Sequence, residues 1–151
     1  MSTLEKKSVF FLCTGNSCRS QMAEGFLRYF SRDRYEVSSA GTYPMGLNSR
    51  AVEAMQDIDI DISDQRSQSI DEFEGVSFDY VVTVCDRANE SCPTTPVALT
   101  RLHWGIDDPT NLSGSSDERR AEFARVRDII AGHIKQFIRD DSQEPQADVR
   151  S

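Results

Sequence analysis

The chain has 151 residues and a formal net charge of −8 at pH 7, with an isoelectric point of about 4.7. This length fits a single domain with its own hydrophobic core. The excess of acidic residues argues against a surface that binds nucleic acid or an anionic membrane. The sequence has a small basic cluster at Arg119-Arg120, which does not change this conclusion. The polar start of the chain and the short apolar run after it match neither a secretion signal nor a membrane span, so we expect a cytoplasmic protein.

The first strong pattern joins an apolar run at 9–12 to a helical pattern that starts near Gln21. A short apolar run of this kind is typical of a buried strand. The helical pattern places apolar side chains on one face: Met22, Ala23, Phe26, Leu27 and Phe30. The residues between the run and the helix are therefore predicted to form a strand-to-helix loop.

This loop has the pattern C-x5-R, with Cys13 at its start and Arg19 near its end. A glycine-containing loop before a helix turns backbone N–H groups toward the helix N-terminus, which binds anions. The guanidinium of Arg19 matches the oxygens of a tetrahedral oxyanion, and the same positive field favours the nucleophilic thiolate of Cys13. The alternatives are a chance pattern and a cysteine that is only a small buried hydrophobe. The predicted oxyanion-binding residues are Thr14, Gly15, Asn16, Ser17, Cys18, Arg19 and Ser20.

The rest of the chain alternates predicted strands and helices, which indicates a single α/β domain. A short helix is expected over 51–55, capped by Asn48 or Ser49. The polar stretch 57–75 is expected to be a loop or a short irregular helix. The further predicted strands are 35–40, 78–84 and 97–102.

A long helix is predicted near the end of the chain. Ser115 and Glu118 form a capping box at its start, and its apolar stripe comprises Phe123, Val126, Ile130, Ile134 and Phe137. Residues 141–151 lack an apolar face, so we predict a domain over 1–140 followed by a disordered tail.

Three cysteines follow Cys13 in the sequence: Cys18, Cys85 and Cys92. In a reducing cytoplasm they are poor candidates for permanent disulfides, and their spacings do not fit the usual zinc patterns. Cys85 ends a predicted strand, as Cys13 does. Because ligands bind at the carboxyl ends of parallel strands, both thiols are predicted to face one crevice.

A thiolate that attacks a tetrahedral oxyanion needs an acid to protonate the oxygen that leaves. Asp108, which precedes Pro109 in a loop after the last predicted strand, is a candidate for that role. The alternative is that residues 107–109 form only a turn. Spacing alone leaves both interpretations open.

Three segments, 13–24, 84–93 and 103–109, together resemble the thioredoxin-coupled arsenate reductases, which share the low-molecular-weight tyrosine phosphatase fold. The resemblance spans nearly the whole domain. It implies a four-stranded parallel sheet flanked by helices on both faces. It also implies a role for each matching residue: Cys13 as nucleophile, Arg19 as oxyanion clamp, Asp108 as general acid, Cys85 and Cys92 as redox pair, and Cys18 as a packing residue.

The implied reaction is the reduction of arsenate to arsenite without a cofactor, for which two thiols supply two electrons by forming one disulfide. In this hypothesis Cys13 attacks arsenic, Cys85 attacks the sulfur of Cys13 and expels arsenite, and Cys92 then attacks Cys85. A helical 85–92 segment would separate its terminal Cα atoms by about 10.5 Å, whereas a disulfide needs about 7 Å or less. The segment must therefore refold on oxidation. We expect a monomer with thioredoxin as electron donor; a low-molecular-weight thiol is the alternative donor.

Members of this family often hold a monovalent cation, typically potassium, behind the loop. Asn16, Glu24 and Ser39 match positions of that site, but Arg66 and Gln68 stand where a hydroxyl and a carboxylate are usual. A cation beside a guanidinium is disfavoured by Coulomb repulsion. We therefore expect a degenerate site with no metal, the guanidinium of Arg66 in place of the cation, and equal activity in sodium and potassium salts.

Two other functions compete with arsenate reduction. A low-molecular-weight tyrosine phosphatase usually has proline where Gln21 stands and an aromatic residue where Thr110 stands, and it would leave Cys85 and Cys92 unexplained. Weak phosphatase activity is still expected, because the loop accepts phosphate. The second alternative is a non-enzymatic oxyanion or redox sensor, which the combination of nucleophile, acid and resolving pair disfavours.

Overall fold

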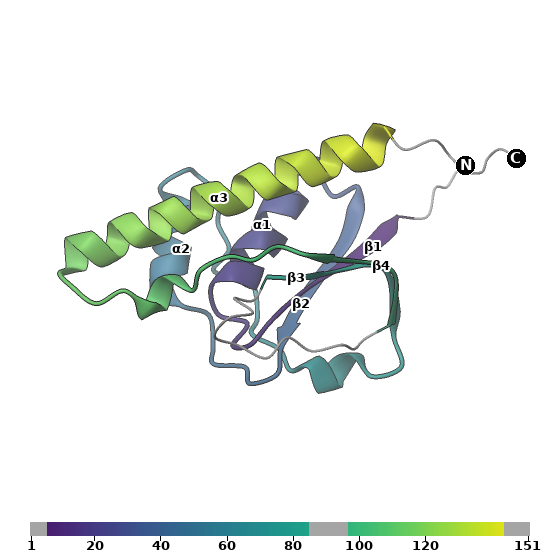
Figure 1. Cartoon of the computed structure of the whole chain (residues 1–151), viewed down its shortest axis with the longest axis horizontal. Helices are drawn as coiled ribbons and strands as arrows, with labels where there is room; N and C mark the ends of the chain where they lie inside the picture. Colours follow the sequence, from purple (N-terminus) through teal and green to yellow (C-terminus); the bar gives the residue numbers. More distant parts are fainter. Residues whose placement is uncertain (1–5, 85–96, 144–151) are drawn as a thin grey trace, which may run out of the picture.

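The computed structural model describes residues 6–84 and 97–143. These form one α/β domain around a four-stranded sheet with the order β2-β1-β3-β4 (Figure 1). Every neighbouring pair of strands is parallel, which confirms the predicted fold class. The elements are β1 (Lys7–Cys13), α1 (Arg19–Ser31), β2 (Tyr35–Gly41), α2 (Ser49–Gln56), η1 (Ile70–Phe73), β3 (Ser77–Thr83), β4 (Val97–His103), η2 (Pro109–Asn111) and α3 (Ser116–Gln143).

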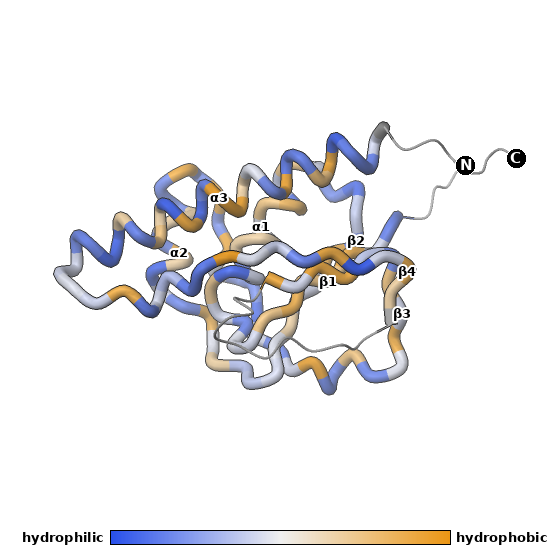
Figure 2. The backbone as a smooth tube through the Cα atoms, viewed as in Figure 1, coloured by the Kyte–Doolittle hydropathy of each residue, from blue (hydrophilic) through white to orange (hydrophobic). Residues whose placement is uncertain are grey.

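The central strand β1 supplies side chains to two hydrophobic cores, because successive strand residues point to opposite faces. Val9 and Phe11 belong to the larger core, which packs against α1, α2 and α3. Phe10 and Leu12 belong to the smaller core, which the short 3₁₀ helix η1 covers on the other face. Helices therefore flank both faces, unequally. Figure 2 shows the hydrophobic residues concentrated along the central strands.

The helix predictions are largely confirmed. The helix α1 begins at Arg19, two residues before the expected start. Asn48 is the cap of α2, since its side chain accepts hydrogen bonds from the N–H groups of Arg50 and Ala51. The polar stretch before β3 contains η1 and is otherwise irregular.

The long helix α3 starts with the predicted capping box. The Ser115 hydroxyl accepts from the Glu118 N–H (3.1 Å), and the Glu118 carboxylate accepts from the Ser115 N–H (2.8 Å). The whole predicted apolar stripe is buried. The helix continues to Gln143, three residues beyond the predicted domain boundary at 140.

Asp141 explains this longer helix. Its carboxylate accepts hydrogen bonds from Lys7 (2.7 Å), Tyr35 (2.5 Å) and Tyr80 (2.6 Å). These bonds fasten the last turn of α3 to three strands. The last turn is therefore held by a polar residue, although it lacks an apolar face. The remaining tail, 144–151, lies outside the described residues.

Two further predictions also fall outside the described residues. Cys85 and Cys92 belong to the segment 85–96, as does the conformational change expected between them. In the described parts of the chain, no helix has the length and apolarity needed to cross a membrane.

Candidate active site

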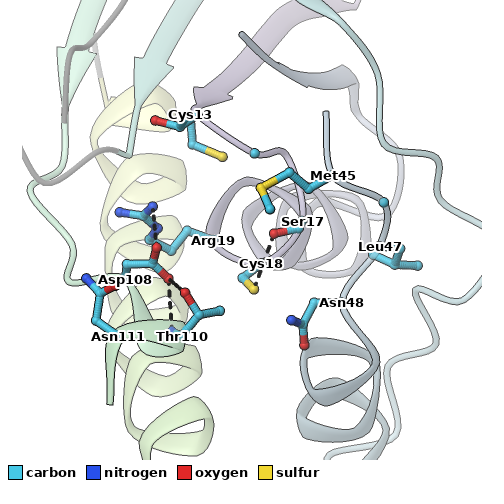
Figure 3. A pocket seen from close by; sticks show the side chains of 13 residues that line it. Cys13, Ser17, Cys18, Arg19, Met45, Leu47, Asn48, Asp108, Thr110 and Asn111 are labelled. Atoms are coloured by element: carbon cyan, nitrogen blue, oxygen red, sulfur yellow. Dashed lines mark hydrogen bonds and ion pairs between the residues drawn. The ribbon is translucent and has the colours of Figure 1, made fainter. Parts of the chain in front are cut away.

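A cavity of about 710 Å³ opens at the carboxyl ends of the strands (Figure 3). The loop between β1 and α1, the segment after β2 and the loop around η2 line it, so three chain segments meet at this edge as parallel topology requires. Cys13, Arg19 and Asp108 all line this cavity. The other lining residues are Thr14, Gly15, Ser17, Cys18, Met45, Gly46, Leu47, Asn48, Thr110 and Asn111.

Three backbone hydrogen bonds orient the peptide groups of the loop. The carbonyls of Thr14, Gly15 and Ser17 accept from the N–H groups of Tyr43 (2.9 Å), Met45 (2.9 Å) and Asn48 (3.1 Å). In a trans peptide the N–H points opposite to the C=O, so the N–H that follows each of these carbonyls turns away from the segment 43–48. The N–H in the Gly15–Asn16 peptide accordingly donates to the sulfur of Cys13 (3.2 Å).

The helix α1 presents an uncompensated N-terminus to this cavity. Cys18 is the N-cap residue, but its side chain gives no capping hydrogen bond, and the first turn contains no acidic residue. Since the first N–H groups of a helix carry partial positive charge, this end of α1 favours an anion. The geometry therefore fits the oxyanion-binding loop predicted from the sequence.

Cys13 is 2% exposed, and its sulfur lies 2.9 Å from the hydroxyl oxygen of Ser20. That oxygen also accepts from the side-chain amide of Asn16 (2.8 Å). Because the amide occupies an oxygen lone pair, the hydroxyl proton of Ser20 is available to the sulfur. Two donors, the Asn16 N–H and the Ser20 hydroxyl, can thus stabilise negative charge on the nucleophile.

Asn16 organises the loop from behind the cavity, where it is fully buried. Its backbone is in the left-handed region with φ of 48°, a strained conformation for a residue other than glycine. Its side chain donates to Ser20 and Ser39 and accepts from the N–H of Gln68 (2.8 Å). These bonds hold the strained residue in place. Asn16 and Ser20 therefore support the predicted oxyanion-binding loop without lining its cavity.

The hydrogen-bond network continues from Ser39 to Glu24 of α1. The Ser39 hydroxyl donates to one Glu24 oxygen (2.6 Å), and Arg28 donates to the other (2.5 Å) and to the carbonyl of Val37 (2.7 Å). Burial raises the pKa of the Glu24 carboxyl, although the bonds from Ser39 and Arg28 act in the opposite direction. An arginine near the surface is thereby connected to Cys13 through Glu24, Ser39, Asn16 and Ser20.

The expectation that the guanidinium of Arg66 takes the place of a cation is wrong. The Arg66 side chain is 72% exposed and lies 4.0 Å from Glu72, since full hydration favours a charged group that has no buried partner. Arg28 is the guanidinium that reaches Glu24.

The residues proposed for the cation site do not fit a cation in this arrangement. Both Glu24 oxygens already accept bonds, and Asn16 turns its NH₂ group toward Ser39 and Ser20. Among residues 6–84 and 97–143, no three His, Cys, Asp or Glu side chains cluster as metal ligands.

Arg19 and Asp108 face each other across one side of the cavity (Figure 3). The Arg19 guanidinium donates to the carbonyl of Ile106 (2.9 Å) and lies 3.6 Å from the Asp108 carboxylate. The other Asp108 oxygen accepts from the N–H and the hydroxyl of Thr110 (2.9 and 2.7 Å). Asp108 is thereby the N-cap residue of η2. Asp108 therefore forms the turn and also faces the cavity, so its role as general acid stays a prediction.

Cys18 differs from Cys13 in its surroundings. It is 3% exposed and belongs to the larger hydrophobic core. Burial raises the pKa of its thiol to about 12, so Cys18 remains protonated at neutral pH. This agrees with the packing role expected from the resemblance.

Residues 8–149 match the model of the family described as low molecular weight phosphotyrosine protein phosphatase. The chain belongs to this family. It is 51% identical to an arsenate reductase of Shouchella clausii over 134 residues, which cover 89% of this chain and 96% of that protein. It is 48% identical to an arsenate reductase of Bacillus subtilis over the same shares of the two chains.

A solved relative in this phosphatase family supports the same placement. The structure of an arsenate reductase in the phosphate binding state aligns with a TM-score of 0.76 and 29% identity, covering 89% of this chain and 98% of that one. The fold and the position of the loop are therefore those of a phosphatase family that includes arsenate reductases.

Sequence reasoning missed the cavity wall formed by the segment after β2, with Met45, Leu47 and Asn48. One signal was available: the loop after β2 must begin at the same sheet edge as Cys13, and Gly41 closes that strand. A Cβ atom on Gly41 would lie 2.4 Å from the Thr14 carbonyl oxygen, so this close approach requires glycine. Arg28 was also missed.

Proposed function

We propose that this protein is an arsenate reductase that uses Cys13 as nucleophile and thioredoxin as electron donor. The observation that carries the proposal is the meeting of Cys13, Arg19 and Asp108 in one cavity behind which Ser20 and Asn16 donate toward the sulfur. The similarity to arsenate reductases at about half of all aligned positions supports the choice of arsenate.

The cavity wall favours a small inorganic oxyanion over an aryl phosphate. Among the described residues that line it, none is aromatic, whereas a flat phenyl ring stacks favourably on aromatic side chains. Thr110, at the position where a phosphatase usually has an aromatic residue, instead donates to Asp108. Phosphatase activity is therefore expected to be a weak side reaction.

In the first step the Cys13 thiolate attacks arsenic, and a sulfur–arsenic bond replaces a bond to oxygen. Asp108 passes a proton to the oxygen that leaves as water. Arg19 must release Asp108 and turn its guanidinium to the arsenate oxygens, a charge-assisted pairing that is at least as strong as the 3.6 Å ion pair it replaces. Cys13 is then covalently bound to As(V).

In the second step the thiolate of Cys85 attacks the sulfur of Cys13. The electron pair of the sulfur–arsenic bond passes to arsenic, which leaves as arsenite, and a Cys13–Cys85 disulfide forms. Cys92 then attacks Cys85, which frees Cys13 and leaves a Cys85–Cys92 disulfide for reduction by the dithiol of thioredoxin. Two thiols lose two electrons, the number that As(V) gains.

One contact just after β3 supports the pairing of Cys85 with Cys13 in the second step. Val84, the residue before Cys85 in the sequence, donates its N–H to the carbonyl of Leu12 (3.0 Å). Leu12 directly precedes Cys13. Because consecutive Cα atoms are about 3.8 Å apart, the chain leaves β3 at the edge where the nucleophile lies.

The test is arsenate-dependent oxidation of NADPH in the presence of thioredoxin and thioredoxin reductase. Cys13→Ser, Cys85→Ser and Cys92→Ser are each expected to abolish turnover, while Cys92→Ser still releases arsenite in a single round. Cys18→Ser serves as the matched control and should retain turnover. Faster hydrolysis of p-nitrophenyl phosphate than reduction of arsenate would identify a phosphatase. Stoichiometric arsenate binding without arsenite would identify a non-enzymatic binding protein.

A further inference from the structure

A second cavity, of about 340 Å³, adjoins the catalytic cavity. The two cavities share Asn48, Thr110 and Asn111 in their walls. The smaller cavity is further lined by Arg50 of α2 and Arg119 of α3, neither of which lines the catalytic cavity. None of its described lining residues carries a carboxylate.

The two arginines are placed to meet an anion. Arg50 is half-buried, and its guanidinium donates to the carbonyl and hydroxyl oxygens of Ser116 (3.5 and 3.3 Å), both neutral groups. Arg119 is exposed. Neighbouring arginines of α3 lie against carboxylates instead: Arg120 is 3.6 Å from Asp57, and Arg125 is 2.8 Å from Glu122.

The two arginines place positive charge on a protein whose overall charge repels anions. The whole chain carries a formal net charge of −8, and the Asp108 carboxylate lies at the catalytic cavity itself. Both repel a dianion that approaches from solution. Charged clefts can raise the rate of association of an opposite charge by tenfold or more at low ionic strength. The described lining of this cavity has no carboxylate, so its two guanidinium groups can attract an anion to the entrance.

We propose that Arg50 and Arg119 form an entry subsite that captures a tetrahedral oxyanion and passes it to the cavity of Cys13. The inference rests on the proposed function in that the physiological oxyanion is arsenate. The subsite acts on association alone, because neither guanidinium lines the catalytic cavity. It therefore affects kcat/KM and leaves the chemical steps at saturating arsenate unaltered.

The test compares Arg119→Gln with Arg120→Gln, the adjacent residue of the same helix that faces Asp57. At low ionic strength Arg119→Gln is expected to lower kcat/KM for arsenate on the order of threefold with kcat retained. In about 0.5 M sodium chloride this difference disappears, because the Debye length falls to a few Å. Arg119→Lys, which keeps the charge, retains most of the wild-type value, and thermal unfolding confirms that each variant is folded.

Calorimetric binding of inorganic arsenate to the Cys13→Ser variant separates this inference from the proposed function. Weaker binding on adding Arg119→Gln, but not Arg120→Gln, supports the subsite even if the wild type reduces no arsenate. Equal effects of Arg119→Gln and Arg120→Gln in both assays would overturn the subsite and leave the reductase proposal intact. An Arg119→Gln effect that persists at high salt, or that Arg119→Lys fails to rescue, would also overturn it.

Discussion

Opposite edges of the parallel sheet each hold a carboxylate in a hydrogen-bond network, and the pKa values of the two carboxylates shift in opposite directions. At the carboxyl edge, burial raises the pKa of Glu24 despite the bonds from Ser39 and Arg28. At the amino edge, burial of Asp141 acts in the same direction, but hydrogen bonds from Lys7, Tyr35 and Tyr80 outweigh it and lower its pKa.

The difference shows that the depth of burial and the number of donors together set the pKa of a carboxylate. Three donors converge on Asp141, and the ionised form is the stable one. Glu24 lies deeper in the fold, and burial raises its pKa although Ser39 and Arg28 donate to it; shifted pKa values are common near active sites. One network serves mainly to hold the fold, and the other serves mainly to position the loop of Cys13.

Among the changes that test this comparison, Glu24→Ala is expected to have the largest effect. The variant leaves the Ser39 hydroxyl and Arg28 without their acceptor, so Asn16 and Ser20 lose their fixed positions behind Cys13. Small displacements of this kind can lower a catalytic rate about tenfold to a hundredfold. Steady-state arsenate reduction measures the loss, and a wild-type rate in a folded Glu24→Ala protein would contradict the positioning role.

Asp141→Ala is expected to act on stability instead. It leaves two partly buried tyrosine hydroxyls without an acceptor, at a cost of about 2–3 kcal/mol in the free energy of unfolding, while turnover stays within about twofold because Cys13 is at the other edge. Urea denaturation measures the change. Asp140→Ala is the matched control, since Asp140 accepts from the exposed side chain of Gln136; this variant is expected to cost less than about 0.5 kcal/mol.

The pH dependence of stability should have opposite signs for the two carboxylates. The folded pKa of Glu24 is raised from 4.5, so the advantage of wild type over Glu24→Gln decreases as pH rises above that value. The folded pKa of Asp141 is lowered from 3.8, so the advantage of wild type over Asp141→Asn is present above that value and is lost as pH falls.

Denaturant unfolding across this pH range measures both differences between wild type and variant. If the stability differences for Glu24→Gln and Asp141→Asn changed with pH in the same direction, the opposite pKa shifts of the two carboxylates would be contradicted. Because each variant is compared with wild type, the titration of all other groups cancels.

The smallest expected effect is that of exchanging sodium for potassium chloride. Both Glu24 oxygens accept bonds from the protein itself, so turnover should be equal in the two salts. Arg28→Ala frees one of those oxygens and is expected to lower turnover about twofold, an effect typical of a partly exposed ion pair. Strong activation of the wild type by potassium would show that the Glu24 network rearranges around a cation.

Periodicity was enough to predict most of the architecture. The apolar run before Cys13 and the stripe from Phe123 to Phe137 are buried as expected, because burial of one face is what creates such patterns. The C-x5-R loop was also predictable, since a thiol, a glycine and an arginine at that spacing have a shared chemistry.

The parts that could not be predicted depend on tertiary contacts between polar residues. Arg28 follows Glu24 by four residues, a spacing that usually indicates only a surface pair. Asp141 looked like part of a polar tail because nothing in the sequence links it to Tyr35 and Tyr80, which are far away along the chain. The path of the segment 43–48 is set by its backbone hydrogen bonds to the loop between β1 and α1, and its own sequence has no periodic pattern that would predict this path.

The helix α3 has 28 residues, so it is about 42 Å long at 1.5 Å per residue. Arg119 lies in its first turns beside the entrance, and Asp141 lies in its last turn at the far edge. The buried stripe of α3 lies between these two ends, so a single continuous helix carries both an anchor at one edge of the sheet and a guanidinium beside the substrate entrance at the other.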